Sequence, residues 1–147
     1  MSIETLSVTR ISEYIITRFY LDKDKASISN LKLQKLLYFV QGEAIKQHGI
    51  CAFEEEIEAW DYGPVVRSVY DRFKVFGAGP INRDYDTPTI TGDIKIVIDT
   101  VIEKYANASA WRMVQETHKP DTPWYNAFQN GEAIISKTSM IQYFKAS

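Results

Sequence analysis

The sequence has 147 residues, the length of one ordinary domain, and its 45% hydrophobic and 24% charged residues are typical of a globular protein. The 17 basic and 19 acidic residues give a net charge of −2, which argues against a dedicated nucleic-acid-binding module, because such a module presents a basic face. No apolar run approaches the ~20 residues of a membrane span, and the N-terminus lacks a signal-peptide pattern. We therefore expect a cytoplasmic protein with no membrane partner.

Apolar residues at helical spacing predict two helices in the first third of the chain. The first has Ser7 as its expected N-cap and ends in a charged loop after about residue 21. The second covers about 30–48, with Gly49 as its expected C-terminal cap. Its apolar residues cover much of its circumference, which is typical of a central, buried helix. The first helix should bury one stripe, formed by Val8, Ile11, Ile15 and Phe19.

The segment 58–67 reads as a short strand that breaks sharply into a helix. Gly63 accepts backbone angles that are closed to other residues. Pro64 suits the first position of a helix, where its missing N–H has no consequence. A third helix is then expected, with an apolar stripe of Val65, Val66, Val69, Tyr70 and Phe73.

The second half of the chain predicts an irregular segment followed by three helices, a short strand and a last helix. Residues 77–92 show no periodicity, so we expect a long loop whose role the sequence does not indicate. A fourth helix opens at Thr91 or Gly92 with the stripe Ile94, Val97, Ile98, Val101, Ile102 and Tyr105. Ser109 is the expected cap of a fifth helix that carries Ala110, Trp111 and Val114 and ends near His118. A short sixth helix follows, with Thr122 as its N-cap and Pro123 in its first turn.

A strand at 133–136 and a last helix capped by Thr138 complete the prediction. The two strand segments can pair, so we expect a small two-stranded antiparallel sheet of 57–60 with 133–136. The fold class is mainly α: one domain over residues 1–147, built as a bundle of about six to seven helices. The three tryptophans, Trp60, Trp111 and Trp124, are expected to anchor its core.

The chemically reactive residues form no convincing catalytic or metal constellation. His48 and Cys51 lie close in sequence, but Gly49 should end the helix between them, and no third group is present to orient the pair. His118 is expected at a helix C-terminus, where its charge is mildly favoured. One cysteine and two histidines without metal-ligand spacing make a transition-metal site improbable. We expect no enzyme activity, cofactor or metal.

Several of these segments together resemble a known family, the SocA-like or Panacea antitoxin domain, which includes phage-associated proteins called GepA. The matching segments are 33–39 in the second helix, 57–65 across the strand end, Thr117-His118, Pro123-Trp124 and the strand before the last helix. The loop 77–92 matches nothing in that pattern. The positions that carry the family signature are Leu36, Tyr38, Trp60, Gly63, Pro64, His118, Pro123 and Trp124.

The resemblance implies a mostly helical single domain, found in bacteria and on phages. It implies an antitoxin that neutralises a toxin encoded beside it by direct protein–protein binding. At least one branch resembles a proteolytic adaptor that delivers its toxin to a AAA+ protease, so this alternative stays open. A phage or prophage accessory protein of other function is a further alternative. The partner's identity and the oligomeric state are not implied.

One surface is expected to make the partner contact. Tyr62 fits neither the predicted strand nor the predicted helix stripe, and Arg67 lies nearby. Tyrosine and arginine are typical binding hot spots. The acidic run before them is either a solvated edge that discourages strand aggregation or a patch that attracts a basic partner. Its members are Glu54, Glu55, Glu56 and Glu58.

Overall fold

The structure, a computed structural model, describes residues 5–22, 24–86 and 89–147. The described chain folds into helices and one small sheet, so the expected mainly α fold is confirmed. None of its helices is long and apolar enough to cross a membrane. In chain order the elements are α1 (Val8–Leu21), α2 (Asn30–His48), β1 (Ile57–Trp60), β2 (Gly63–Val65), α3 (Arg67–Phe73), η1 (Lys74–Phe76), α4 (Gly92–Tyr105), α5 (Ala110–Thr117), α6 (Pro123–Gln129), β3 (Ile134–Ile135) and α7 (Lys137–Lys145).

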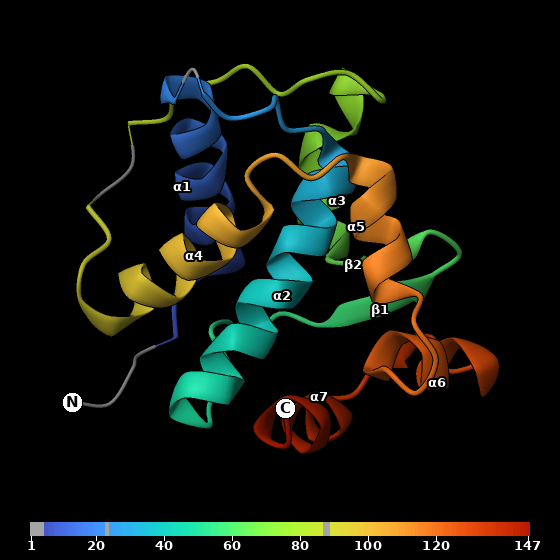
Figure 1. Cartoon of the computed structure of the whole chain (residues 1–147). Coiled ribbons are helices and arrows are strands. Elements are labelled where there is room, and N and C mark those ends of the chain that lie inside the picture. Colours follow the sequence, from blue (N-terminus) through green and yellow to red (C-terminus); the bar gives the residue numbers. More distant parts are fainter. Residues whose placement is uncertain (1–4, 23, 87–88) are drawn as a thin grey trace.

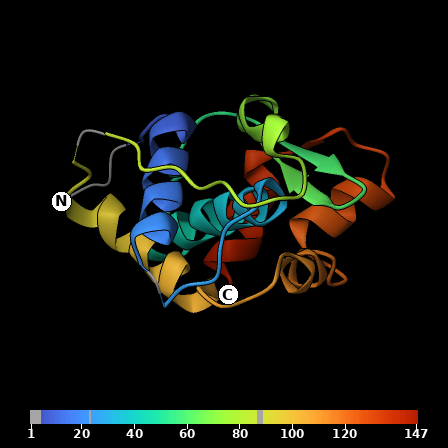
Figure 2. The same cartoon turned by 90° about the horizontal axis from the view of Figure 1, so that it is seen from above.

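Helix α2 runs through the middle of the molecule, as its apolar pattern predicts. It packs against α1, α3, α4, α5, α7 and β2. Figures 1 and 2 show α1 and α4 on one side of α2, and the sheet with α6 on the other. Its last turn ends at Gly49, whose φ of 73° gives the left-handed cap expected there. Because α2 contacts most other elements, its side chains position the sheet relative to the other helices.

The predicted starts of α1, α4, α5 and α6 are confirmed, and the predicted stripes of α1 and α4 are buried. Ser7, Ser109 and Thr122 each accept a hydrogen bond from a backbone N–H of the first turn. Every residue of the predicted stripe of α4 is buried. The last helix begins earlier than predicted: Ser136 is its N-cap and Thr138 lies inside it, because β3 ends at Ile135 and leaves the Ser136 side chain free to cap.

The sheet has three strands in the order β2-β1-β3, one more than the sequence predicts. Strand β1 pairs with β3 as expected, with Ile57 opposite Ile135. On its other edge β1 pairs with β2, with Trp60 opposite Gly63 and Ala59 opposite Pro64. The expected strand-to-helix junction is therefore wrong: the chain makes a hairpin first, and α3 starts only at Arg67. Pro64 is tolerated because β2 is an edge strand.

The tryptophans differ from their expected common role in the core. Trp124 is buried, with 4% of its surface exposed, whereas Trp111 is 60% exposed. Helix α5 buries Met113, Val114 and Thr117 instead, and this stripe turns Trp111 towards solvent. Trp60 is half-buried at the sheet surface.

The long segment between η1 and α4 is irregular, as predicted, and two apolar residues attach it to the core. Ile81 and Ile90 are buried. The Ile81 N–H donates to the Ile28 carbonyl at 2.7 Å, and the Tyr85 N–H donates to Thr17 Oγ1 at 2.9 Å. Residues 87 and 88 of the predicted loop lie outside the described residues.

Candidate protein-binding site

A cluster of aromatic and charged side chains covers the outer side of the β1–β2 hairpin and the start of α3. We call it the hairpin face; its members are Glu58, Trp60, Tyr62, Arg67 and Tyr70. The Arg67 guanidinium donates from Nε to Glu58 Oε2 at 3.0 Å and from Nη2 to Glu58 Oε1 at 2.9 Å. These hydrogen bonds lower the pKa of Glu58 and raise that of Arg67, so both groups stay charged.

Trp60 links the parts of this face. Its ring lies 4.9 Å from the Tyr70 ring in an edge-to-face arrangement, and the Arg67 guanidinium lies 5.1 Å from its centroid. Its Nε1 donates to Glu58 at 3.0 Å. The expectation that Trp60 anchors the core is therefore wrong for its ring. Its backbone carbonyl, by contrast, accepts a hydrogen bond from the buried Trp124 indole at 2.8 Å.

The structure brings together only part of the residues predicted to bind a partner. Tyr62 lies in the hairpin turn and is 65% exposed, as expected. Arg67 and Glu58 pair with each other on the hairpin face. The other three acidic residues precede β1 and have separate surroundings: Glu55 accepts the Val8 N–H, Glu56 pairs with Lys137, and Glu54 is exposed. The acidic run is therefore not one patch.

Buried polar side chains of α2 hold the backbone of the hairpin and of α3 in place. Gln34 Oε1 accepts the Val66 N–H at 2.8 Å, and Asn30 Nδ2 donates to the Tyr70 carbonyl at 3.1 Å. Lys35 Nζ donates to the Pro64 carbonyl at 3.0 Å. Each bond satisfies a backbone group in an edge strand or near a helix terminus, where regular pairing leaves partners missing. The hairpin face therefore rests on a rigid central helix.

Several family-signature residues meet beneath this hairpin. Gly63 has φ +111°, and a Cβ there would lie 2.8 Å from Thr117 Oγ1 and 2.9 Å from Lys35 Cε. Next to it, the His118 ring stacks on Trp124 with centroids 4.0 Å apart and planes 2° apart. His118 Nε2 is buried without a hydrogen-bond partner. Burial and the charge of Lys35 lower the pKa of His118. These residues are structural supports of the hairpin.

The remaining signature residues lie on the central helix α2 and at the start of α6. Leu36 and Tyr38 are buried on α2, and Pro123 occupies the first turn of α6, as predicted. The Tyr38 ring packs edge-on against Phe39 and Phe144. The signature residues therefore lie where α2, the hairpin, the end of α5 and α6 pack against one another.

Sequence reasoning missed two buried lysines of α2, Lys32 and Lys35, which are 2% and 0% exposed. Burial lowers the pKa of Lys35 to about 7 and that of Lys32 to about 8. Lys32 Nζ donates to the Ala106 carbonyl at 3.2 Å and lies 4.8 Å from the Phe19 ring centroid. The only signal in the sequence was their place in a helix that is apolar around most of its circumference.

These depressed pKa values predict that stability rises with pH above neutrality. Between about pH 7 and the ordinary lysine pKa of 10.5, the unfolded chain binds a proton at position 35 that the folded chain largely lacks. From pH 7 to 8.5 the free energy of unfolding should therefore increase by roughly 1–2 kcal/mol from Lys35. Urea unfolding of the wild type and Lys35→Met at both pH values measures this. Equal pH dependence in the two proteins contradicts it.

The reactive residues are placed apart from the hairpin face. His48 ends α2 and Cys51 follows the left-handed Gly49. Burial raises the pKa of the Cys51 thiol, which disfavours the nucleophilic thiolate. Within residues 5–22, 24–86 and 89–147, no group of three His, Cys, Asp or Glu side chains is arranged to hold a metal ion. The absence of enzyme activity stays a prediction.

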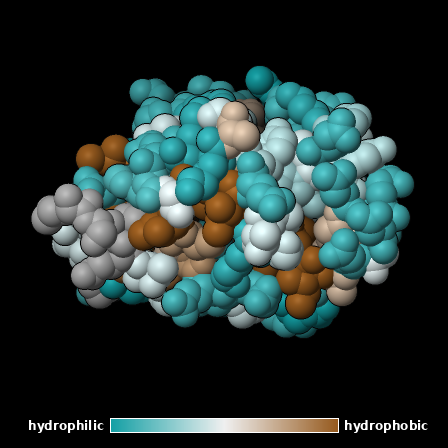
Figure 3. Space-filling model, turned by 90° about the horizontal axis from the view of Figure 1, so that it is seen from below, coloured by the Kyte–Doolittle hydropathy of each residue, from teal (hydrophilic) through white to brown (hydrophobic). Residues whose placement is uncertain are grey.

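Figure 3 shows the lower face of the molecule in the orientation of Figure 1. In the part drawn in colour, hydrophobic side chains gather in separate small areas between hydrophilic ones. A large exposed apolar patch is the usual mark of a docking surface, and this face is broken up by polar side chains. The hairpin face differs in kind, because it combines aromatic rings with an ordered ion pair.

Comparison with known proteins relates the chain to an antitoxin family. The family model described as antitoxin SocA-like, Panacea domain matches residues 33–125, which include most of α2, the hairpin and α5. The protein called antitoxin SocA from Caulobacter vibrioides (strain NA1000 / CB15N) is 33% identical over 124 residues. The match covers 74% of this chain and 66% of that relative, so it spans slightly less than two thirds of the relative's length. No solved structure matches the chain.

Proposed function

The chain belongs to the antitoxin SocA-like, Panacea domain family, and on that premise we propose that it neutralises a toxin protein by binding it directly. The toxin is encoded nearby, and the two proteins meet in the cytoplasm. The hairpin face makes the central contact and covers the toxin's active site or the path of its substrate. The ordered Glu58–Arg67–Trp60 arrangement is the observation that carries this assignment.

The composition of the hairpin face supports a role in binding. Tryptophan, tyrosine and arginine are the residue types most enriched among hot spots, and all three lie here. Tyr62 offers 65% of its surface and the Arg67 side chain 59%. Both are large enough to enter a pocket of a partner.

The rigidity of the face supports the same proposal. Glu58 and Trp60 fix the Arg67 guanidinium before any partner arrives, and α2 holds the backbone beneath it. Binding then immobilises few additional side chains, so less conformational entropy is lost on association. A preformed surface of this kind suits neutralisation by occlusion.

The function is tested by co-expression. Expression of the product of the adjacent gene alone should stop growth, and adding this chain should restore it. Occlusion leaves the amount of toxin unchanged, which separates it from delivery to a protease. Continued growth arrest on co-expression contradicts the proposal, as does a neighbour whose expression leaves growth unaffected.

The hairpin face is tested by substitution. Tyr62→Ala and Arg67→Glu should each weaken toxin binding by about 30-fold, since loss of a hot spot changes the binding free energy by roughly 2 kcal/mol. Tyr62 is 65% exposed, so Tyr62→Ala should change stability by less than about 0.5 kcal/mol. Arg67→Glu also breaks the pair with Glu58 and sets two carboxylates side by side, so it should lose about 1 kcal/mol and still fold. Calorimetric titration of the purified proteins measures the binding.

Matched controls are available elsewhere on the surface. Val75 is 82% exposed on η1, and Arg83 is exposed in the segment before α4. Val75→Ala and Arg83→Glu should leave the affinity unchanged. Full neutralisation by folded Tyr62→Ala and Arg67→Glu proteins shows that the contact lies elsewhere.

A further inference from the structure

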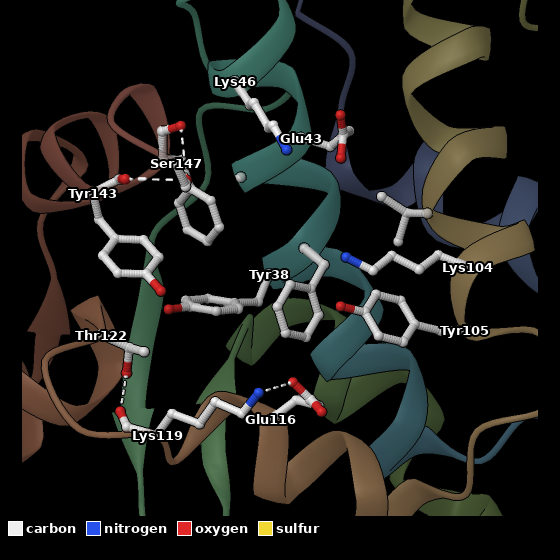
Figure 4. Close-up of a pocket in the computed structure, with 14 residues that line it drawn as sticks. Tyr38, Glu43, Lys46, Lys104, Tyr105, Glu116, Lys119, Thr122, Tyr143 and Ser147 are labelled. Atoms are coloured by element: carbon white, nitrogen blue, oxygen red, sulfur yellow. Dashed lines mark hydrogen bonds and ion pairs between the residues drawn. The ribbon is translucent and has the colours of Figure 1, made fainter.

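A pocket and a sheet edge lie outside the hairpin face. The pocket, of about 220 Å³, lies in front of α2 between α4, α5 and α7 (Figure 4). Side chains of both signs of charge line it, so it selects no ligand by charge. They are Glu43, Glu116, Lys46, Lys104 and Lys119. The sheet edge at β3 is the more specific feature, because an open strand edge is a template for another extended chain.

Side chains of α2 already close the other edge of the sheet, at β2. Lys35 Nζ donates to the Pro64 carbonyl, and Gln34 Oε1 accepts the Val66 N–H. Pro64 itself has no N–H to offer to a neighbouring strand. The backbone groups along this edge are therefore satisfied from within the chain, and a further strand finds no partner here.

The edge at β3 has no such cover. The Ala59 N–H donates to the Ala133 carbonyl at 2.8 Å, so the backbone groups of Ala133 face β1. Successive residues of a strand alternate between its two edges, and the N–H and C=O of Ile134 therefore point away from β1. Neither group has a hydrogen-bond partner in the part of the chain that the structure describes. Figure 2 shows the segment between α6 and α7 at the outer border of the molecule.

The Ile134 side chain lies on the same side of the sheet as the hairpin face. Ile134 is opposite Glu58, and the side chains of directly opposite residues project to the same face. Trp60 projects there too, because it is two residues from Glu58. Ile134 is 44% exposed, whereas Ile135, on the other face, is 2% exposed. The hairpin face therefore continues across the sheet to its open edge.

We propose that an extended segment of the toxin pairs with β3 and becomes a fourth strand of the sheet. Its backbone accepts the Ile134 N–H and donates to the Ile134 carbonyl, and an apolar side chain of the segment contacts that of Ile134. Strand addition of this kind draws its affinity from main-chain hydrogen bonds and its specificity from alternate side chains. The inference rests on the toxin-binding proposal and adds the chemistry of the contact.

The short length of β3 favours the toxin over a second copy of this chain. The strand has two residues, Ile134 and Ile135, so pairing between two β3 strands would by itself bury little surface. A stable interface buries about 800 Å² on each partner. The toxin reaches a larger area because it covers the hairpin face together with the adjoining edge.

The pairing is tested by NMR in the wild-type complex, with this chain isotope-labelled and the product of the adjacent gene unlabelled. The Ile134 amide should exchange quickly in the free protein and at least tenfold more slowly in the complex, because its N–H gains an acceptor. Isotope-filtered spectra should show cross-peaks from the Ile134 N–H to backbone protons of the toxin.

The outcomes separate this inference from the toxin-binding proposal. A complex that protects residues 58–70 but leaves the exchange of Ile134 unchanged overturns the strand pairing and leaves toxin binding in place. Cross-peaks from Ile134 to a second copy of this chain, in a mixture of labelled and unlabelled protein, also overturn it. Absence of any complex overturns both.

Substitution at Ile134 separates backbone pairing from side-chain contact. Ile134→Pro removes the outward N–H and should weaken toxin binding about tenfold in a calorimetric titration. Proline is tolerated where the N–H of an edge strand faces solvent, so the fold should be retained. Ile134→Val keeps the N–H and should bind within about twofold of the wild type. Wild-type affinity of a folded Ile134→Pro protein, or an equal loss in Ile134→Val, overturns the proposal; if Ile134→Pro does not fold, the wild-type spectra decide.

Discussion

Replacement of Gly63 by alanine should lower the free energy of unfolding by about 3 kcal/mol or more. Its φ of +111° is a conformation that L residues rarely adopt, and holding one there costs about 1–3 kcal/mol. The added Cβ would also meet Thr117 Oγ1 at 2.8 Å and Lys35 Cε at 2.9 Å, and both of these residues are buried. Urea unfolding at one fixed pH measures the change.

Gly131 provides the matched control for this substitution. Its φ is +69°, and a Cβ there would meet no atom within 4 Å. Gly131→Ala should therefore carry only the conformational penalty, about 1–2 kcal/mol. If the two variants lose equal stability, the close packing of the hairpin on Lys35 and Thr117 does not contribute as described.

Replacement of Trp124 by alanine should lower the free energy of unfolding by about 3–5 kcal/mol, the range for truncating a buried aromatic residue. The variant loses the stacking on His118 and Phe128, and the Trp60 carbonyl loses its donor. The loss should extend to the hairpin, because Trp124 joins α6 to the end of β1. Thermal or urea unfolding measures the effect.

Trp111→Ala is the comparison for Trp124→Ala. Trp111 is 60% exposed, so its truncation should change stability by less than about 0.5 kcal/mol. A loss from Trp111→Ala as large as that from Trp124→Ala contradicts the opposite roles that the structure gives them.

The helices were predictable because their signals are local. Caps such as Ser7, Ser109 and Thr122 lie immediately before apolar residues at helical spacing, and no distant contact is needed to recognise them. The pairing of β1 with β3 was also predictable, because both segments read as short strands and a strand needs a partner. The same local reasoning misplaced Trp111, since several apolar stripes fit a helix as short as α5.

The second half of the hairpin and its support depend on contacts that no sequence pattern shows. A strand of three residues has no measurable alternation, and Pro64 fits an edge strand as well as a helix start. Lys35 is a charged residue, and charge ordinarily predicts exposure. Its burial follows only from the position of α2 at the centre of the bundle. The Glu58–Arg67–Trp60 arrangement, in turn, requires β1 and α3 to meet.

Amide hydrogen exchange tests most directly the claim that the hairpin face binds the toxin. The exchange of this chain is measured alone and in complex with the product of the adjacent gene. We expect slower exchange in the complex for peptides that cover residues 58–70, because the partner covers the hairpin and the start of α3. Unchanged exchange over 58–70, with protection confined to other parts of the chain, would contradict it.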